Sequence, residues 1–126
     1  VMDRMSKEQL SGLPTFSEQI SQKVVLQANH FELTVEPSML EKSGVLSNGV
    51  LTEVLTTVTR QLMMNSGKNL IIEQLLVYYL QAVQVDDTLR IETRIVRQTR
   101  RSAIIDFDLY LNLQLVTKAT VTLKIT

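Results

Sequence analysis

The sequence predicts an α+β domain in which a curved antiparallel sheet wraps around one central helix. The helix is indicated by residues 50–62, whose apolar side chains recur at the spacing of one helical face. The sheet is indicated by residues 69–125, where apolar runs of strand length are separated by short turns. A helix with one apolar stripe needs a surface that covers it, and an antiparallel sheet has such a face.

The central helix is expected to begin after Asn48, behind a candidate N-cap. It contains Thr at positions 52, 56, 57 and 59, and threonine is a mediocre helix former. Burial against the sheet must therefore hold this segment in its helical form. The side chains that we expect to be buried are Val50, Leu51, Val54, Leu55, Val58 and Leu62.

Strands are predicted on both sides of the helix. Residues 30–36 alternate apolar and polar side chains and form the first expected strand. Residues 69–83 are apolar on both faces, which is typical of a strand that is covered on each side or shared with a second subunit. A basic hairpin tip is expected at residues 98–102. Three further runs alternate and predict antiparallel strands: residues 89–95, 103–111 and 119–125.

The length of 126 residues, with 44% hydrophobic residues, indicates one domain with a real core. Residues 1–28 have a mixed pattern and are expected to form an N-terminal linker or lid with a short helix that starts at Ser17. Residues 29–126 are expected to form the folded domain. Because the sequence starts at Val1 without a methionine, we expect it to be a piece of a longer protein.

Composition argues against several classes of function. Thirteen basic residues balance thirteen acidic ones, so no overall field attracts a nucleic acid. With no cysteine and one histidine, a metal site has almost no support. Asp106 and Asp108 share one strand face, where cross-strand pairing with Lys and Arg is expected. No signal core or membrane-spanning run is found, which favours a cytoplasmic protein without a membrane partner.

The start of the predicted helix is the first candidate site. A helix start presents backbone N–H groups that have no partner within the helix, so it binds anions and polarised oxygens. N-capping and a tight turn explain the same residues structurally. The candidate ligand-binding residues at this point are Ser47, Asn48, Gly49 and Val50.

Two further groups are candidate ligand contacts. Arg100 and Arg101 at the basic hairpin tip suit the phosphates of a bound ligand, although charged residues on a turn need no ligand. Tyr79 follows Tyr78 on a strand, so the two side chains face opposite ways. We expect one of them to line an acyl or adenine pocket, or to pack in the core or an interface.

Over residues 30–126 the chain resembles the hot-dog fold superfamily, the family of acyl-CoA thioesterases and dehydratases. The resemblance is carried by the order and spacing of residues 37–49, residues 79–89 and the hairpin that turns at Arg100 and Arg101. Residues 44–51 are also similar to hot-dog domains at the C-terminus of bacterial proteins that contain a pair of CBS domains.

This resemblance implies a homodimer, or a dimer of dimers, with acyl-CoA thioester sites at the subunit interface and no additional cofactor. It also implies that the backbone N–H of Gly49 points at the thioester carbonyl, where hydrolysis develops an oxyanion. Thioesterases of the His-Gly-Gly type carry an Asp or Glu seven residues after the second Gly. If Gly49 takes that place, Ser47 replaces the His and Asn48 the first Gly. Thr56 then occupies the acidic position.

The candidate catalytic residues are therefore Asn48, Gly49, Glu53 and Thr56. A neutral threonine hydroxyl cannot act as the general base that activates water. Glu53 is the remaining carboxylate on the helix, but a Glu in the first turns also complements the helix dipole.

The sequence therefore favours an acyl-CoA-binding module that senses its ligand within a larger regulatory, CBS-domain-containing protein, with little or no hydrolysis. An active acyl-CoA thioesterase that uses the Gly49 N–H and Asn48, with Glu53 as a further candidate, is the second hypothesis. A dimerisation module without a ligand is the third, and the apolar run at residues 69–83 is the feature in its favour.

Overall fold

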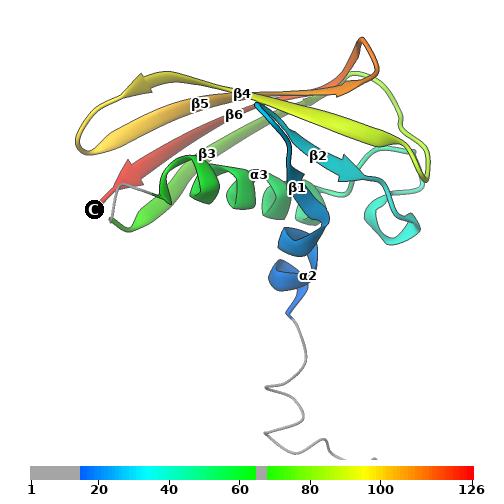
Figure 1. The fold of residues 1–126 in the computed structure, drawn as a ribbon, viewed down its shortest axis with the longest axis horizontal. Helices are drawn as coiled ribbons and strands as arrows, with labels where there is room; N and C mark the ends of the chain where they lie inside the picture. The colour runs from blue at the N-terminus through cyan, green and yellow to red at the C-terminus, as the bar shows by residue number, and fades with distance from the viewer. Residues whose placement is uncertain (1–14, 65–67) are drawn as a thin grey trace, which may run out of the picture.

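The structure is a computed structural model that describes residues 15–64 and 68–126. These residues form one antiparallel sheet, a long helix under its concave face and a short helix before the first strand (Figure 1). The elements in chain order are α2 Phe16–Lys23, β1 Val24–Leu26, β2 Phe31–Thr34, the 3-10 helix η1 Pro37–Met39, α3 Asn48–Leu62, β3 Leu70–Tyr79, β4 Thr88–Gln98, β5 Ser102–Leu111 and β6 Gln114–Ile125.

The sheet has six strands in the order β1-β2-β4-β5-β6-β3, and every neighbouring pair is antiparallel. With α3 as the central helix, this is the hot-dog fold, and the fold class predicted from the sequence is confirmed. The strand β3 follows α3 in the chain but lies at the edge of the sheet, where it pairs with β6 and not with β4. The connection between β3 and β4 therefore leads from the edge of the sheet, past the positions of β6 and β5, to β4 in its middle.

The sequence pattern did not predict the strand β1. Residues 30–36 were expected to contain the first strand, but Val24, Val25 and Leu26 pair with β2 ahead of it. Three apolar residues in a row show no alternation, so nothing in their pattern indicates a strand. Both β1 and α2 fall within the segment that was expected to be a linker or lid with a short helix starting at Ser17, and α2 begins at Phe16. The first 14 residues of that segment lie outside the described part of the chain.

The core lies between α3 and the concave face of the sheet. All of the expected helix positions are buried except Leu62, which is half-buried, and Thr59 is buried beside them. The sheet contributes the following fully buried side chains: Leu33, Leu89, Ile91, Ile105, Phe107, Leu109, Ala119, Val121 and Leu123. Because these side chains alternate along each strand, one face of the sheet is apolar and the other is polar.

The polar outer face is stabilised by ion pairs between neighbouring strands. Arg94 lies 2.9 Å from Asp106, and Lys118 lies 2.9 Å from Asp108, so the expected cross-strand pairing of the two aspartates is confirmed. Thr120 also donates a hydrogen bond of 2.8 Å to Asp106. The hydrogen bonds from Arg94 and Thr120 hold the pKa of the Asp106 carboxyl below its ordinary value.

The edge strand β3 is covered on one face only. Its side chains alternate between half-buried and exposed, and Ile71, Leu76 and Tyr78 are 50%, 45% and 60% exposed. The run was expected to be covered on both faces or shared with a second subunit, and within one protomer its outer face is open. None of the helices within residues 15–64 and 68–126 has the length and apolar character to cross a membrane.

We predict that Asp106→Asn lowers stability at neutral pH by about 1 kcal/mol, because a carboxylate that accepts charge-assisted hydrogen bonds is lost. The folded-state pKa of Asp106 lies below its unfolded value of about 3.9, so the ionised group stabilises the fold above that pH. This contribution disappears as the pH falls through the lower, folded-state pKa. Urea unfolding between about pH 7 and pH 2 should show the two proteins converging in acid.

The matched control for this experiment is Asp86→Asn, in the exposed turn before β4. Asp86 has a positive φ of 73°, which asparagine tolerates, so this variant should keep nearly the stability of the parent. Equal stability of the Asp106→Asn variant and the parent at pH 7 would contradict the assignment.

Candidate functional site

The start of α3 is a capped helix terminus with two free amides. Ser47 is the N-cap, and its side chain accepts a hydrogen bond of 3.2 Å from the N–H of Val50. The helix therefore begins at Asn48 itself, one residue earlier than expected. Capping satisfies the amide of Val50, so Val50, which is also buried, is not available as a donor to a ligand. The N–H groups of Asn48 and Gly49 have no partner within the described residues.

The chain before α3 holds this terminus in place. The N–H of Ser47 donates to the carbonyl of Met39 at 2.8 Å, and the carbonyl of Gly44 accepts from Val83 at 2.8 Å. Gly44 has a φ of 84°, and an added Cβ would lie 3.2 Å from the Cβ of Ala82, so only glycine suits this turn. An added Cβ at Gly49 would meet nothing within 4 Å. The side of Gly49 where a side chain would stand is therefore open, and Asn48 and Gly49 are both exposed.

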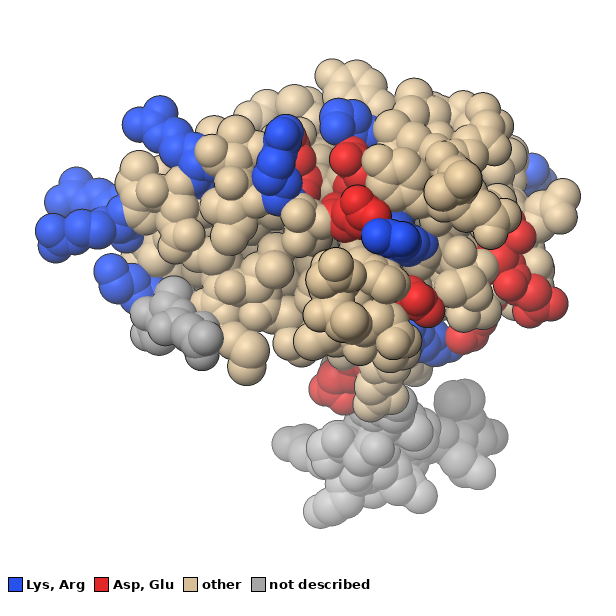
Figure 2. All heavy atoms as spheres, turned by 45° about the horizontal axis from the view of Figure 1, so that its top comes forward, with Lys and Arg blue, Asp and Glu red and all other residues tan. Residues whose placement is uncertain are grey.

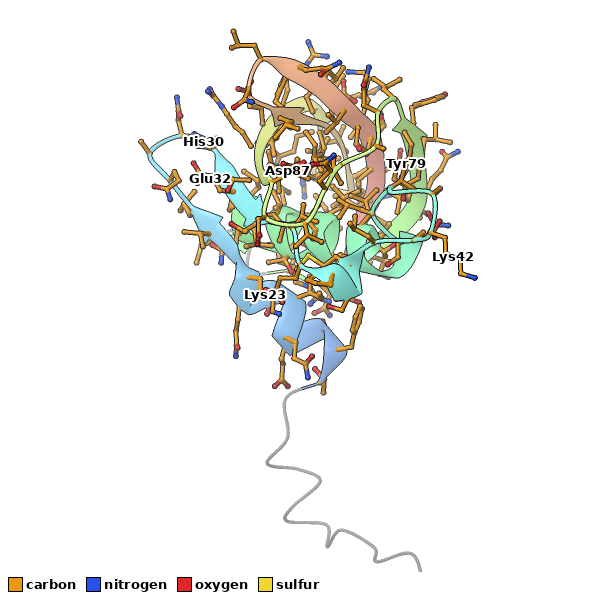
Figure 3. The ribbon with its side chains drawn as sticks, turned by 90° about the vertical axis from the view of Figure 1, so that its right-hand side faces the viewer. Lys23, His30, Glu32, Lys42, Tyr79 and Asp87 are labelled. Carbon is orange, nitrogen blue, oxygen red and sulfur yellow. The ribbon has the colours of Figure 1, made fainter. Side chains whose placement is uncertain are left out.

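Tyr79 lies at the end of β3 beside the start of α3 (Figure 3). Its hydroxyl donates a hydrogen bond of 2.9 Å to Oδ1 of Asn48. Partial burial, together with the negative charge of Glu41, raises the pKa of this hydroxyl above its ordinary value, so Tyr79 remains a donor at neutral pH. The structure thus brings together Tyr79 and the Ser47–Gly49 turn, which are distant in the sequence.

Glu53 and Thr56 lie on different sides of α3. Ser17 in α2 donates a hydrogen bond of 2.6 Å to Oε2 of Glu53, so this carboxylate faces the N-terminal helix. Thr56 instead lines a cavity of about 230 Å³ together with Leu70 and Ile72 of β3. The structure does not bring the one acidic side chain of α3 to the cavity that Thr56 lines.

The remaining residues of this cavity are Thr59 and Arg60. Sequence analysis did not identify any of its residues except Thr56. The helical spacing places Thr59 at the border of the apolar stripe of α3, and this was the only indication in the sequence that Thr59 is buried. No pattern in the sequence indicates which strand faces that border.

Arg100 and Arg101 lie at the tip of the β4–β5 hairpin, as expected. They lie at the opposite end of the sheet from Tyr79, because Ile125 bonds to Arg101 and pairs with Leu70 at the start of β3. With about 3.3 Å per residue, β3 separates its two ends by about 30 Å. One protomer therefore does not bring the hairpin arginines to the start of α3.

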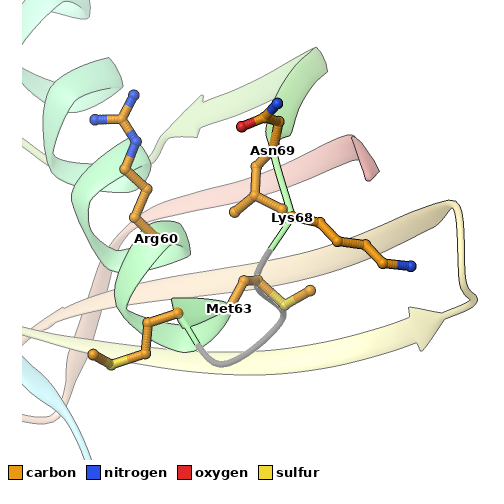
Figure 4. Close-up of a pocket in the computed structure, with 6 residues that line it drawn as sticks. Arg60, Met63, Lys68 and Asn69 are labelled. Atoms are coloured by element: carbon orange, nitrogen blue, oxygen red, sulfur yellow. The ribbon is translucent and has the colours of Figure 1, made fainter. Parts of the chain in front are cut away.

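Basic side chains gather at this hairpin end of the molecule (Figure 2). A cavity of about 450 Å³ is lined there by Lys68, Gln98, Thr99, Arg100 and Ile125. A second cavity, of about 510 Å³, lies at the end of α3 (Figure 4) and is lined by Arg60, Met63, Met64, Lys68, Asn69 and Leu70. Neither cavity has an acidic residue among these lining residues, so this end of the molecule favours binding of an anionic group such as a phosphate.

The described part of the chain contains no cluster of side chains arranged as metal ligands. No group of three His, Asp or Glu side chains within residues 15–64 and 68–126 is placed to hold an ion. His30 lies 2.9 Å from Glu32 on the other side of the sheet from β3.

Comparison with known proteins relates this chain to the thioesterase superfamily. Residues 43–112 match the family model described as the thioesterase superfamily. The uncharacterized protein YtoI of Bacillus subtilis (strain 168) is 26% identical over 90 residues, which is 71% of this chain and 20% of that protein. The chain therefore spans about a fifth of the length of this relative.

Solved structures share the fold over most of their length. A hypothetical thioesterase from Streptococcus pneumoniae TIGR4 with coenzyme A is 24% identical, with a TM-score of 0.70 over 82% of this chain and 84% of that chain. The protein smu.793 from Streptococcus mutans UA159, bound to acetyl CoA, is 24% identical, with a TM-score of 0.69 over 82% and 87%. Thioesterase superfamily member 2 from Mus musculus is 18% identical, with a TM-score of 0.74 over 84% of both chains.

We predict that Tyr79→Phe removes the hydrogen bond to Asn48 and lowers stability by about 0.5–1.5 kcal/mol. It should also remove a phenol that ionises above the ordinary tyrosine pKa in a spectrophotometric titration, because burial and the charge of Glu41 raise the pKa of Tyr79. Tyr78→Phe is the control, since Tyr78 is 60% exposed on the other face of β3. If Tyr78→Phe and not Tyr79→Phe lost the late-ionising phenol, the described contact would be wrong.

Proposed function

Since the chain belongs to the thioesterase superfamily, we propose that it binds acyl-CoA thioesters at the start of α3, with little or no hydrolysis. The observation that supports this best is the pair of unpartnered N–H groups of Asn48 and Gly49, two exposed residues in the first turn of α3. These groups lie at the positive end of the helix dipole, where they can donate to a thioester oxygen. The pneumococcal and S. mutans relatives of this fold hold coenzyme A and acetyl CoA.

We propose that the working unit is a homodimer that pairs through β3. This strand is an open edge with free backbone groups and exposed apolar side chains, which natural sheets rarely leave uncovered. Antiparallel pairing of β3 with its copy follows from a two-fold axis and would join the two sheets into one. In such a pair the exposed side chains of Ile71, Leu76 and Tyr78 would lie beside those of the partner strand on the outer face of the joined sheet.

The same arrangement would complete the ligand site. In an antiparallel pair, the Tyr79 end of one β3 lies beside the Leu70 end of the other. The free amides of one protomer then lie near the cavities at the end of α3 in its partner, and near the hairpin that carries Arg100 and Arg101. A thioester held at Gly49 could therefore extend its CoA phosphates toward basic side chains that one protomer alone places about 30 Å away.

Weak hydrolysis is proposed because no Asp, Glu or His within residues 15–64 and 68–126 lines the cavity beside Thr56. Thr56 is neutral, and the carboxylate of Glu53 accepts the hydroxyl of Ser17 on the α2 side of the helix. The free amides would still polarise a bound carbonyl, so the chain keeps the means of binding a thioester while lacking the group that would activate water.

A sensing role within a longer, cytoplasmic CBS-domain protein is a further part of this proposal. It is supported by the resemblance of residues 44–51 and by the greater length of the matched B. subtilis relative, of which the match covers 20%. The contact between Ser17 and Glu53 links α2, the described element nearest the N-terminus, to the helix that would bind the ligand. A ligand-dependent change at α3 would thus have a path to a preceding domain.

We predict that CoA and acetyl-CoA raise the melting temperature, because a ligand at 100 times its Kd stabilises a protein by about 2.7 kcal/mol. Arg100→Gln combined with Arg101→Gln should weaken binding of both ligands at least about tenfold through lost phosphate contacts. Arg90→Gln, on the outer face at the far end of β4, is the matched control and should bind normally. A thiol-release assay on acetyl-CoA should show little turnover.

Failure of every CoA compound to shift the melting temperature would contradict the binding proposal. Rapid thiol release would instead favour the thioesterase hypothesis over the sensing role.

We predict a solution mass of twice the chain's 14.3 kDa by light scattering at micromolar concentration. Leu76→Lys places a charge in the middle of the open strand and should shift the mass to that of one chain. Because Leu76 is 45% exposed, the protomer itself should remain folded by circular dichroism. Leu113→Lys changes a 97% exposed leucine in the β5–β6 turn and should remain dimeric. A monomeric parent protein, or a dimeric Leu76→Lys variant, would contradict pairing through β3.

A further inference from the structure

The cavity between α3 and β3 has a mixed chemical lining. Its residues are Thr56, Thr59, Arg60, Leu70 and Ile72. The β3 side is apolar, the α3 side carries two hydroxyl groups, and no acidic residue is among the five. Its volume of about 230 Å³ exceeds the roughly 150 Å³ of an engineered cavity that holds benzene. The space therefore suits a short acyl group or a small ring.

The hydroxyl group of Thr59 is the unusual feature of this cavity. It is 1% exposed, and its Oγ1 is buried without a hydrogen-bond partner among the described residues. A threonine in a helix commonly donates to the carbonyl four residues earlier, as Thr52 does to Asn48 at 2.7 Å. Thr59 makes no such bond. A buried hydroxyl without a partner disfavours the folded state, so its presence in an aliphatic core calls for a physical reason.

Arg60 lies next to this hydroxyl in the chain and in the cavity lining. It is exposed, and no carboxylate within residues 15–64 and 68–126 forms an ion pair with it. The cavity therefore combines a buried hydroxyl and an unpaired cation with an apolar wall. A purely aliphatic acyl chain would leave Thr59 unpartnered, whereas an acyl group with an oxygen substituent would satisfy it.

We propose that this cavity selects short acyl groups that carry a hydroxyl or keto oxygen, with Thr59 as the specificity-determining hydrogen-bond partner. The proposal rests on the proposed function, because pairing through β3 would bring the Asn48–Gly49 amides of one protomer beside this cavity of the other. Thr59 already lines the space, and threonine in a helix adopts two rotamers, so rotation about χ1 presents Oγ1 to a ligand.

The test compares 3-hydroxybutyryl-CoA with butyryl-CoA, which differ by one hydroxyl group, by isothermal titration calorimetry. The parent protein should bind the hydroxylated compound about threefold to tenfold more tightly, the range expected for one neutral hydrogen bond. Thr59→Val keeps the shape of the side chain and should lose this preference. Thr59→Ser should retain the preference. The melting temperature of Thr59→Val should not fall, since the hydroxyl has no partner to lose.

The matched control is Thr57→Val, because Thr57 lines a cavity on the α2 side of the helix with Ser17 and Ser21. This variant should keep the preference of the parent. The inference is overturned if the parent binds the two compounds with equal affinity, or if the preference survives Thr59→Val. In either case, binding of butyryl-CoA would leave the proposed function standing. Absence of binding by CoA and by both thioesters overturns the proposed function and this inference together.

Discussion

Burial of the apolar stripe of α3 against the concave sheet is the constraint on which the other features depend. This threonine-rich helix is a weak helix former by itself, so the sheet both stabilises it and sets its orientation. The stripe is long enough that the helix cannot rotate without exposing aliphatic side chains. Its N-terminus is consequently fixed at the rim of the sheet, where Asn48 and Gly49 are exposed.

The same packing divides the remaining surface of α3 into two sides with different chemistry. One side faces α2, where Glu53 accepts the hydroxyl of Ser17. The other faces β3, where Thr56 and Thr59 line a cavity against apolar side chains. A carboxylate on the β3 side could activate water beside a bound thioester, but on the α2 side it links the helix to the N-terminal element. This division is the physical basis for proposing binding with little turnover.

The fold was largely predictable because it rests on periodicity. The helical stripe and the alternating strands are one-dimensional patterns, and the cross-strand pairing of Asp106 and Asp108 follows from alternation with basic neighbours. These patterns do not predict the order of the strands in the sheet, so the pairing of β3 with β6 was not expected. The three residues of β1 were too few to show a period.

The candidate site was predictable only where it is local in sequence. The cap at Ser47 and the free amides after it follow from helix-start chemistry, and the structure adds that capping removes Val50 as a donor. The contact of Tyr79 with Asn48 joins residues 31 positions apart, and the cavity at Thr59 depends on which strand faces the helix. The residues from the two ends of the sheet would meet only between protomers, which no pattern within one chain reveals.

The most direct measurement is a titration of ¹⁵N-labelled protein with acetyl-CoA, followed through the backbone amide resonances. If the free amides of α3 hold the thioester oxygen, the signals of Asn48 and Gly49 should shift downfield in proportion to occupancy, and the already capped amide of Val50 should move less. Saturable binding that leaves the signals of Asn48 and Gly49 in place would contradict the account.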